Sequence, residues 1–240
     1  ADVYGIVNVV RSIIARQCGK GVFIHSGPEQ SVASTKAFTN MVGALALFAL
    51  QLGRSRHLSK TKGKSIIREM RTLPEKIRTY LEQPGPIEQA VELVTKAKSV
   101  LFLGRGISSP VASEGALKLM ESAYIPCLAY PAGEMKHGPI ALIEENSPVV
   151  VIAPNDGVQE RTLNAIHECK ARGAKIILIH EEGDPISETA DVSIPIPSTM
   201  PMLTPLLSVL PTQLIAYHAA LALDNDVDRP RNLAKSVTVE

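Results

Sequence analysis

The sequence predicts an α/β protein with doubly wound parallel sheets and flanking helices. Short apolar strands alternate with helices from residue 99 onward, and these strands lack the polar alternation of half-exposed strands. Apolar residues make up 45% of the chain but aromatic residues only 4%, so the core must be built from Leu, Ile, Val and Ala. Glycine turns follow two of the expected strands, at Gly104–Gly106 and at Asn155–Gly157. Together these features are typical of parallel sheets covered by helices.

Residues 84–240 show the regular alternation and are expected to form one complete doubly wound domain with a C-terminal tail. Ser108 and Ser109 before Pro110 are helix-start signals, and Gly173 is a typical helix end. The expected strands are 99–103, 127–130, 149–153, 175–179 and 192–194. The expected helices are 87–97, 110–121, 158–172 and 204–223, with a shorter one over 134–142.

Residues 1–83 read as the C-terminal part of a first, truncated domain followed by a helical connection. Two apolar strands are expected at 5–10 and 22–25, around a short helix at 12–17. A two-stranded sheet is marginal by itself, so we expect a missing part of the domain, or another chain, to complete it. A long helix over 32–52 is apolar nearly all round and is expected to be buried on most sides, between domains or subunits. Two further helices, 65–72 and 74–82, are expected on either side of Pro74, and the Gln83–Pro86 linker marks the domain boundary.

Composition excludes several classes of function. The formal net charge is +1, and the most basic stretch, 54–64, has no interleaved aromatic residue, which favours a helix connection over a nucleic-acid surface. Cys18, Cys127 and Cys169 are odd in number and far apart, which indicates reduced thiols in the cytoplasm rather than disulfides or a zinc site. The longest apolar run, Met41–Leu50, is shorter than the roughly 20 residues that span a bilayer. We therefore expect no nucleic acid, no membrane, no metal and no cofactor.

One helix and the loop that follows it carry candidate chemistry. Glu114, Lys118 and Glu121 are spaced to share one helix face, and His137 lies in the loop Pro131–Pro139 after the next strand. A carboxylate, an amine and an imidazole in one βαβ unit can transfer protons on a carbonyl compound. Ligands of doubly wound folds bind at the carboxyl ends of the strands, where this loop is expected. The same features are also typical of an ion-paired, solvated helix face and of a structural histidine.

The tail, residues 226–240, is rich in specific polar groups. Arg229 and Arg231 flank Pro230, and Lys235 lies near the end. Such a tail either folds back over a site or remains exposed as a docking segment, and the pattern leaves both open.

Three parts of the chain together resemble one family. They are Val32–Phe38, Glu114–Glu121 with Gly133–Pro139, and the tail 226–240. They resemble the isomerase part of the glutamine–fructose-6-phosphate aminotransferases, also called glucosamine-6-phosphate synthases, which consists of two sugar-isomerase (SIS) domains. The resemblance covers essentially the whole chain, and the tail is its most specific element.

The resemblance implies conversion of fructose 6-phosphate to glucosamine 6-phosphate with ammonia from an N-terminal glutaminase domain, in a homodimer. This chain contains no glutaminase sequence, and it lacks the Ser/Thr-rich phosphate loop of the family's first SIS domain. Residues 1–240 alone are therefore expected to be inactive.

The resemblance also implies roles for individual residues. Lys235 would form a Schiff base with the open ketose, and Glu121 would carry a proton between C1 and C2 of the sugar. Lys118 would stabilise charge on the enolate-like intermediate. His137, reaching the site from a neighbouring subunit, would open the sugar ring. The sugar site would be lined by Val32, Ser34 and Ala234.

The chain departs from the family pattern at a few positions. Gln30 and Ser31 replace a usual apolar residue and a usual glycine, which could have supported a positive φ. Met120 replaces a usual lysine and Pro131 a usual small residue. Neither Met120 nor Pro131 has an implied catalytic role.

Other functions compete with this interpretation. A SIS module that senses phosphosugars would need neither Lys235 nor Glu121, and a simple sugar-phosphate isomerase would lack the glutaminase segment. A dinucleotide oxidoreductase is disfavoured, because the Gly104–Gly106 turn lacks the G-x-G-x-x-G pattern and no acidic residue ends the following strand.

Overall fold

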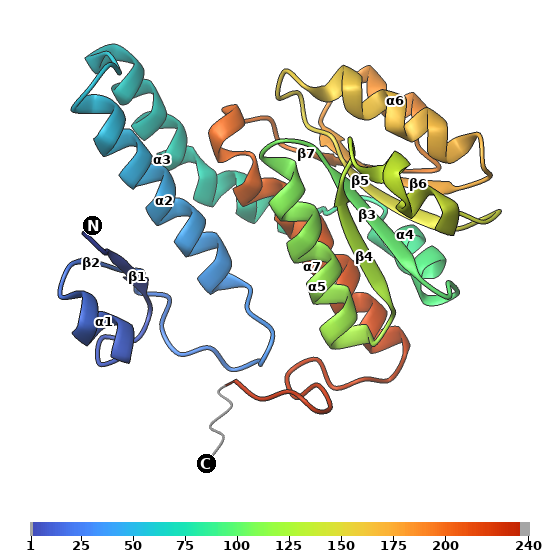
Figure 1. Ribbon diagram of the computed structural model, residues 1–240, viewed down its shortest axis with the longest axis horizontal. Coiled ribbons are helices and arrows are strands. Elements are labelled where there is room, and N and C mark those ends of the chain that lie inside the picture. Colours follow the sequence, from blue (N-terminus) through green and yellow to red (C-terminus); the bar gives the residue numbers. More distant parts are fainter. Residues whose placement is uncertain (1, 236–240) are drawn as a thin grey trace.

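The computed structural model describes residues 2–235, which form two separate parallel sheets joined by long helices (Figure 1). The larger sheet has five strands, in the order β4-β3-β5-β6-β7, and every neighbouring pair is parallel. Its strands are β3 (Val100–Gly104), β4 (Cys127–Pro131), β5 (Pro148–Ile152), β6 (Lys175–Glu181) and β7 (Val192–Ile196). This sheet confirms the predicted doubly wound parallel fold.

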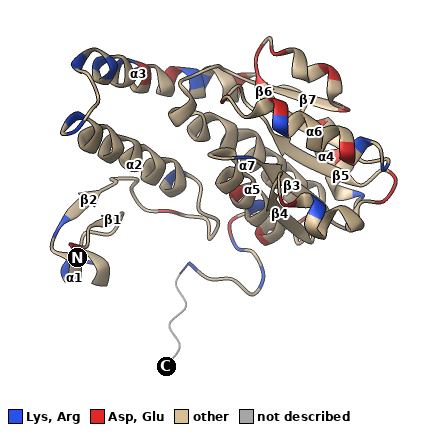
Figure 2. Cartoon of the chain, turned by 45° about the horizontal axis from the view of Figure 1, so that its top comes forward, with Lys and Arg blue, Asp and Glu red and all other residues tan. Residues whose placement is uncertain are grey.

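Helices cover both faces of this sheet. One face packs against α4 (Ile87–Thr95), α5 (Ser108–Ala123) and α7 (Pro205–Ala222), and the other against α6 (Gln159–Lys170). Phe102 and Val150 point into the first core, whereas the next residues, Leu103 and Val151, point into the second. Side chains alternate across a strand, so strands without polar residues fill two cores at once. Figure 2 shows the sheet and α7 almost free of charged side chains.

The turn after β3 requires glycine at its first position. A Cβ on Gly104 would lie 2.3 Å from the backbone oxygen of Ser108, so only glycine allows α5 to begin this close to the strand. The helix begins at Ser108, and its N-cap, Ile107, makes no side-chain capping bond. The prediction that a helix begins near Ser108, Ser109 and Pro110 is therefore confirmed, although both serines lie in its first turn and neither is the N-cap.

The segment 134–142 is not one helix. It forms two short 3₁₀ turns, Met135–His137 and Pro139–Leu142, separated by Gly138 at φ 150°. A helix cannot continue through that backbone angle, and Pro139 has no N–H to donate.

The first part of the chain holds the smaller sheet and two long helices. Strands β1 (Gly5–Val7) and β2 (Gly21–Phe23) pair in parallel around α1 (Ile13–Cys18). The helices α2 (Lys36–Arg54) and α3 (Lys60–Glu82) follow and lead to the larger sheet.

The expectation of two helices split by Pro74 was wrong, because α3 runs through it. Its buried side chains Ile66, Leu73 and Tyr80 recur every seven residues, which places them on one stripe. A proline inside a helix costs about 3 kcal/mol in stability. Packing of this stripe on both sides of Pro74 offsets that cost and keeps the helix continuous.

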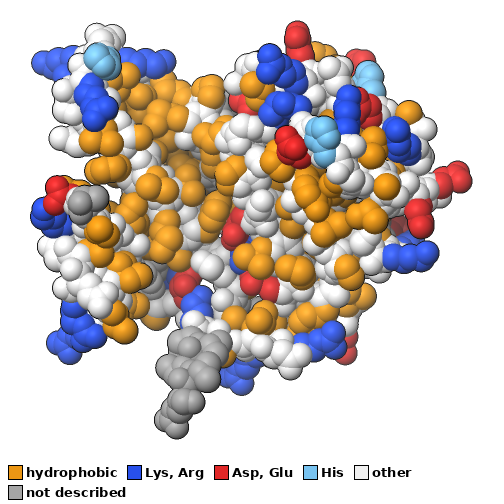
Figure 3. All heavy atoms as spheres, viewed as in Figure 1, with side chains coloured by type: hydrophobic (Ala, Val, Ile, Leu, Met, Phe, Trp, Pro, Cys, Tyr) orange, Lys and Arg blue, Asp and Glu red, His pale blue; other side chains and the backbone are white. Residues whose placement is uncertain are grey.

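The helix α2 is mostly exposed within the described chain, so its burial between domains or subunits stays a prediction. Only Ala37, Ala46 and Leu50 are buried. An apolar groove of about 900 Å³ lies between α2 and the smaller sheet, and Figure 3 shows hydrophobic atoms along this half of the molecule. Its lining includes Tyr4, Val22, Phe23, Leu45, Phe48 and Met70.

Two helical segments are long and apolar enough to cross a bilayer, judged by length and composition alone. They are Lys36–Arg54 and Pro201–Ala222. The second is a core helix whose apolar window is 67% buried, which accounts for its composition. In the first segment, 17% of the apolar window is buried. This is weak evidence, since core helices of soluble proteins pass the same test.

Candidate active site

The predicted row on α5 forms an ion-paired cluster that is largely removed from solvent. Lys118 pairs with Glu121, one turn on, and its Nζ lies 3.4 Å from Oε1 of Glu114, one turn back. The Lys118 side chain is 5% exposed and each of the two carboxylates 14%. The solvated-face interpretation of this row was therefore wrong. A buried ammonium between two carboxylates is costly to desolvate and is stable only while it stays paired.

Glu114 and Glu121 differ in their contact with Lys118, which donates a hydrogen bond to Glu121. The Oε1 of Glu114 is buried and accepts no hydrogen bond within residues 2–235. Burial raises the pKa of the Glu114 carboxyl above its usual value; Lys118 opposes this shift, whereas the neighbouring charge of Glu121 adds to it.

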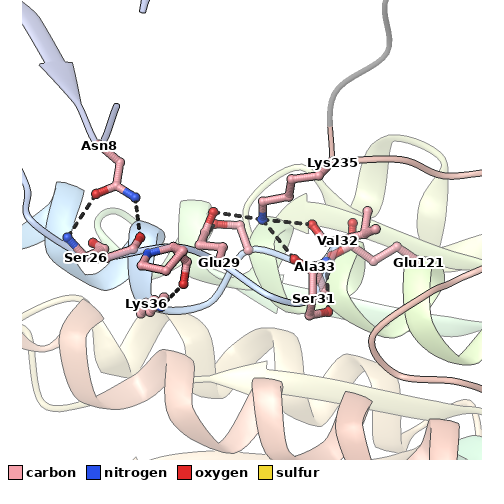
Figure 4. Close-up of polar contacts among 12 residues, drawn as sticks. Asn8, Ser26, Glu29, Ser31, Val32, Ala33, Lys36, Glu121 and Lys235 are labelled. Atoms are coloured by element: carbon pink, nitrogen blue, oxygen red, sulfur yellow. Dashed lines mark hydrogen bonds and ion pairs between the residues drawn. The ribbon is translucent and has the colours of Figure 1, made fainter. Parts of the chain in front are cut away.

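The loop between β2 and α2 forms a second part of the site. The side chain of Asn8 fixes its beginning by donating to the Gly27 carbonyl at 2.8 Å and accepting from the Ser26 N–H at 2.9 Å. Lys36 at the start of α2 donates to the Pro28 carbonyl at 2.6 Å. These contacts, drawn in Figure 4, hold residues 28–33 as an ordered loop although it has no regular secondary structure.

The tail folds back onto this loop. The N–H of Val32 donates to the Asp228 carbonyl at 3.1 Å, and the Ser31 hydroxyl donates to the Val227 carbonyl at 2.9 Å. The carboxylate of Asp226 accepts from the N–H groups of Asp228 and Arg229, which turns the chain toward the loop. Of the two possibilities open for the tail, its described part, 226–235, therefore takes the folded-back one. The remainder of the predicted tail, residues 236–240, lies outside the described residues.

Lys235 is held at the end of this folded-back segment. Its Nζ lies 2.8 Å from a carboxylate oxygen of Glu29 and donates to the carbonyls of Ser31 and Val32 at 3.0 and 3.2 Å. Figure 4 shows the lysine side chain directed at this loop, with Glu121 of α5 drawn beyond Val32. The structure thus brings the tail lysine to the Val32 loop, and it brings Arg231 of the same tail to Tyr124 at the end of α5.

The other residues predicted to line the sugar site, Ser34 and Ala234, lie beside these contacts. Ala234 is the neighbour of Lys235 in the tail, and the Ser34 hydroxyl donates weakly to Glu29 at 3.4 Å. Neither Gln30 nor Ser31 has a positive φ, so the replacement of the family glycine does not strain the loop.

His137 lies apart from this cluster. It is exposed on the 3₁₀ turn that follows the carboxyl end of β4, and its N–H donates to the Glu134 carbonyl at 3.0 Å. Within residues 2–235 its imidazole makes no hydrogen bond or ion pair with Lys118, Glu121 or Lys235. The strand β4, which rises roughly 16 Å, runs between Glu121 and His137 (Figure 1). Within one chain, the His137 imidazole therefore lies at the opposite end of the sheet from Glu121.

Two residues of the site were missed from the sequence. Glu29 follows the Gly27-Pro28 turn just before the Val32–Phe38 segment, and that turn is the one local signal that pointed to it. Tyr124 ends α5 in the left-handed conformation and contacts the tail. No spacing rule links it to a segment more than 100 residues away.

The model of the SIS domain matches residues 93–223 of this chain. The chain belongs to the SIS domain family. It is 49% identical over 238 residues to a glutamine–fructose-6-phosphate aminotransferase [isomerizing] of Thermus thermophilus, which covers 98% of this chain and 39% of that protein. It is 48% identical to the enzyme of the same name from Bacteroides thetaiotaomicron, covering 100% of this chain and 39% of that protein. The chain thus spans about two fifths of the length of these relatives.

A solved structure resembles this SIS chain closely. The C-terminal domain of glucosamine-fructose-6-phosphate aminotransferase from Francisella tularensis superposes with a TM-score of 0.88 at 34% identity, covering 94% of this chain and 64% of that one. The resemblance to the C-terminal isomerase part of these aminotransferases is thereby confirmed along nearly the whole chain.

Proposed function

We propose that this chain is the isomerase part of an enzyme that makes glucosamine 6-phosphate from fructose 6-phosphate and glutamine-derived ammonia. The observation that carries the proposal is the docking of the tail, which presents Lys235 to the loop of Val32 next to the end of α5. The relatives named above bear the corresponding activity in their names. An amine and a carboxylate suit Schiff-base chemistry on a ketose.

In this proposal Lys235 attacks the C2 carbonyl of the open ketose, and the Glu121 carboxylate carries the proton between C1 and C2. Lys118 acts in the same place because its ammonium is buried beside Glu121. A positive charge with little solvent around it stabilises a developing enolate far better than an exposed one. Val32, Ser34 and Ala234 line the sugar site.

The position of His137 favours action between subunits. His137 is exposed and is separated from Glu121 of its own chain by the length of β4. In this proposal it therefore acts on a sugar held at Lys235 of a second copy of the chain. We accordingly propose a homodimer, ring opening by the partner's imidazole, and a glutaminase domain that supplies ammonia. We also propose a division at residues 83/84 between a first and a second SIS unit, and a cytoplasmic location.

The test is glucosamine 6-phosphate formation by the protein expressed from its complete gene. Lys235→Ala is expected to lower the rate by at least about 10²-fold, because the covalent step is lost. Lys98→Ala serves as the control, since this lysine is exposed and pairs with Glu144 rather than with a residue of the site. Undiminished product formation by Lys235→Ala would contradict the proposal. Phosphosugar binding without turnover in the wild-type protein would instead indicate a sensing module.

A further inference from the structure

Glu29 contacts the reacting nitrogen and has no role in the mechanism described so far. Its carboxylate lies 2.8 Å from Lys235 Nζ, and its side chain is 15% exposed, against 40% for the lysine. The other carboxylates of the site have partners of their own. Glu114 and Glu121 pair with Lys118, and Asp226 accepts from the tail backbone. Within residues 2–235, Glu29 is the carboxylate that pairs with Lys235.

The contacts of Nζ match the three N–H groups of an ammonium. Two of them donate to the carbonyls of Ser31 and Val32, and the third faces Glu29. Backbone carbonyls cannot take up a proton at neutral pH, whereas a carboxylate can. An ammonium has no free lone pair, so it must lose a proton before its nitrogen can attack a carbonyl.

We propose that Glu29 both positions Lys235 and accepts the proton that its ammonium must lose before it attacks a sugar carbonyl. This inference rests on the proposed function and adds a residue to it. When Glu29 takes the proton, the two remaining N–H groups still donate to Ser31 and Val32. The free amine is thereby kept at the loop, and its lone pair then turns from Glu29 to the sugar carbonyl.

The step balances without any further reactant. The amine lone pair forms the N–C2 bond while the C2–O π bond breaks and its electrons stay on oxygen. Glu29 returns the proton it accepted, and with the second proton released from nitrogen the oxygen leaves as water. An iminium with one N–H remains, and Glu29 is again a carboxylate. One carboxylate thus serves as base for the attack and as acid for the dehydration.

Two measurements on the complete protein separate this role from simple restraint of the lysine. The first is the rate of acetylation of Lys235 at pH 7.5, read by peptide mass spectrometry. The second is the rate at which borohydride traps fructose 6-phosphate on Lys235, as a secondary amine, in the same variants. Glu29→Gln removes the charge and keeps the shape, and Glu160→Gln on the exposed face of α6 is the matched control.

Glu29→Gln is expected to move the two rates in opposite directions. Acetylation rises by about two- to fivefold, because the lysine nitrogen is no longer held in an ion pair with a carboxylate. Trapping falls by at least about tenfold, because the proton acceptor is gone. Glu160→Gln changes neither rate. In Glu29→Ala, added formate is expected to restore trapping in part, which a merely misfolded loop would not allow.

The outcomes distinguish the two proposals. If the wild-type protein forms no trapped adduct on Lys235, the proposed function fails and the role of Glu29 falls with it. If the wild-type protein is trapped and Glu29→Gln is trapped at the same rate or faster, only the role of Glu29 is overturned. Trapping that is lost in Glu29→Ala and not restored by formate also overturns it.

Discussion

The backbone N–H of Arg231 donates to the hydroxyl of Tyr124 at 2.7 Å, and the guanidinium of Arg231 lies 4.3 Å from the centre of the same ring. This pair fastens the tail to the end of α5, one turn beyond Glu121. The tail is therefore held at two places, on Tyr124 and on the loop of residues 29–33. Loss of either contact should weaken the hold on Lys235.

Removal of the Tyr124 ring should loosen the tail. Tyr124→Ala loses both the hydrogen-bond acceptor and the cation–π contact, together about 1–2 kcal/mol. Trypsin cleavage after Arg231 is then expected to accelerate by about five- to thirtyfold. Tyr124→Phe keeps the ring and should give a smaller increase. Tyr217→Ala, at an exposed position of α7, serves as control, and an equal acceleration there would refute the specific role of Tyr124.

Glu121→Gln should separate the covalent step from proton transfer. The Schiff base on Lys235 should still form and be trapped by borohydride, because that nitrogen does not contact Glu121 within the described chain. Formation of glucosamine 6-phosphate should fall by about 10²–10⁴-fold. Loss of trapping and turnover in equal measure would show that Glu121 does not act at the proton-transfer step.

Removal of the Lys118 ammonium should destabilise the fold. Lys118→Met leaves two largely buried carboxylates without their partner, and the free energy of unfolding is expected to fall by about 3–5 kcal/mol. The triple variant with Glu114→Gln and Glu121→Gln should recover most of this loss, since no unpaired charge remains. Urea unfolding followed by circular dichroism measures the stability of both variants. A triple variant as unstable as the single one would show that the cost comes from packing.

The raised pKa of Glu114 predicts a pH dependence of stability. Because the folded-state value lies above the ordinary value of 4.5, the folded chain binds more protons than the unfolded chain between the two. Stability is therefore lost as pH rises through that window. Glu114→Gln should remove this loss, so that its stability relative to the wild-type chain improves from pH 4 to pH 8. A difference in stability between the variant and the wild-type chain that stays constant over this range would contradict the shift.

The contact between α5 and α7 depends on the small size of Gly115. A Cβ there would lie 2.8 Å from Cβ of Thr212 and 3.1 Å from a ring carbon of Phe102. Gly115→Ala is expected to cost about 1–3 kcal/mol through overpacking. Gly43→Ala in α2 meets nothing within 4 Å and should instead stabilise by about 0.5–1 kcal/mol. Thermal unfolding of the two variants checks both signs.

The amino-acid sequence by itself determined the α/β class, the order of the strands and helices of the larger sheet, and the face shared by Glu114, Lys118 and Glu121. These features follow from local periodicity, which each segment carries without its neighbours. The continuity of α3 through Pro74 did not follow, because packing of Ile66, Leu73 and Tyr80 against distant residues outweighs a local helix breaker.

Only the tertiary structure decided which residues meet. Lys235, Glu29 and Tyr124 are brought together by the path of the tail across the end of α5, and no periodic pattern encodes contacts between segments so far apart. The separation of His137 from Glu121 also depends on the direction of β4, since residues that are near in sequence lie at opposite ends of a strand between them. The row of Glu114, Lys118 and Glu121 has the spacing of a solvent-exposed helix face, but its side chains are largely buried because α5 packs that face inward.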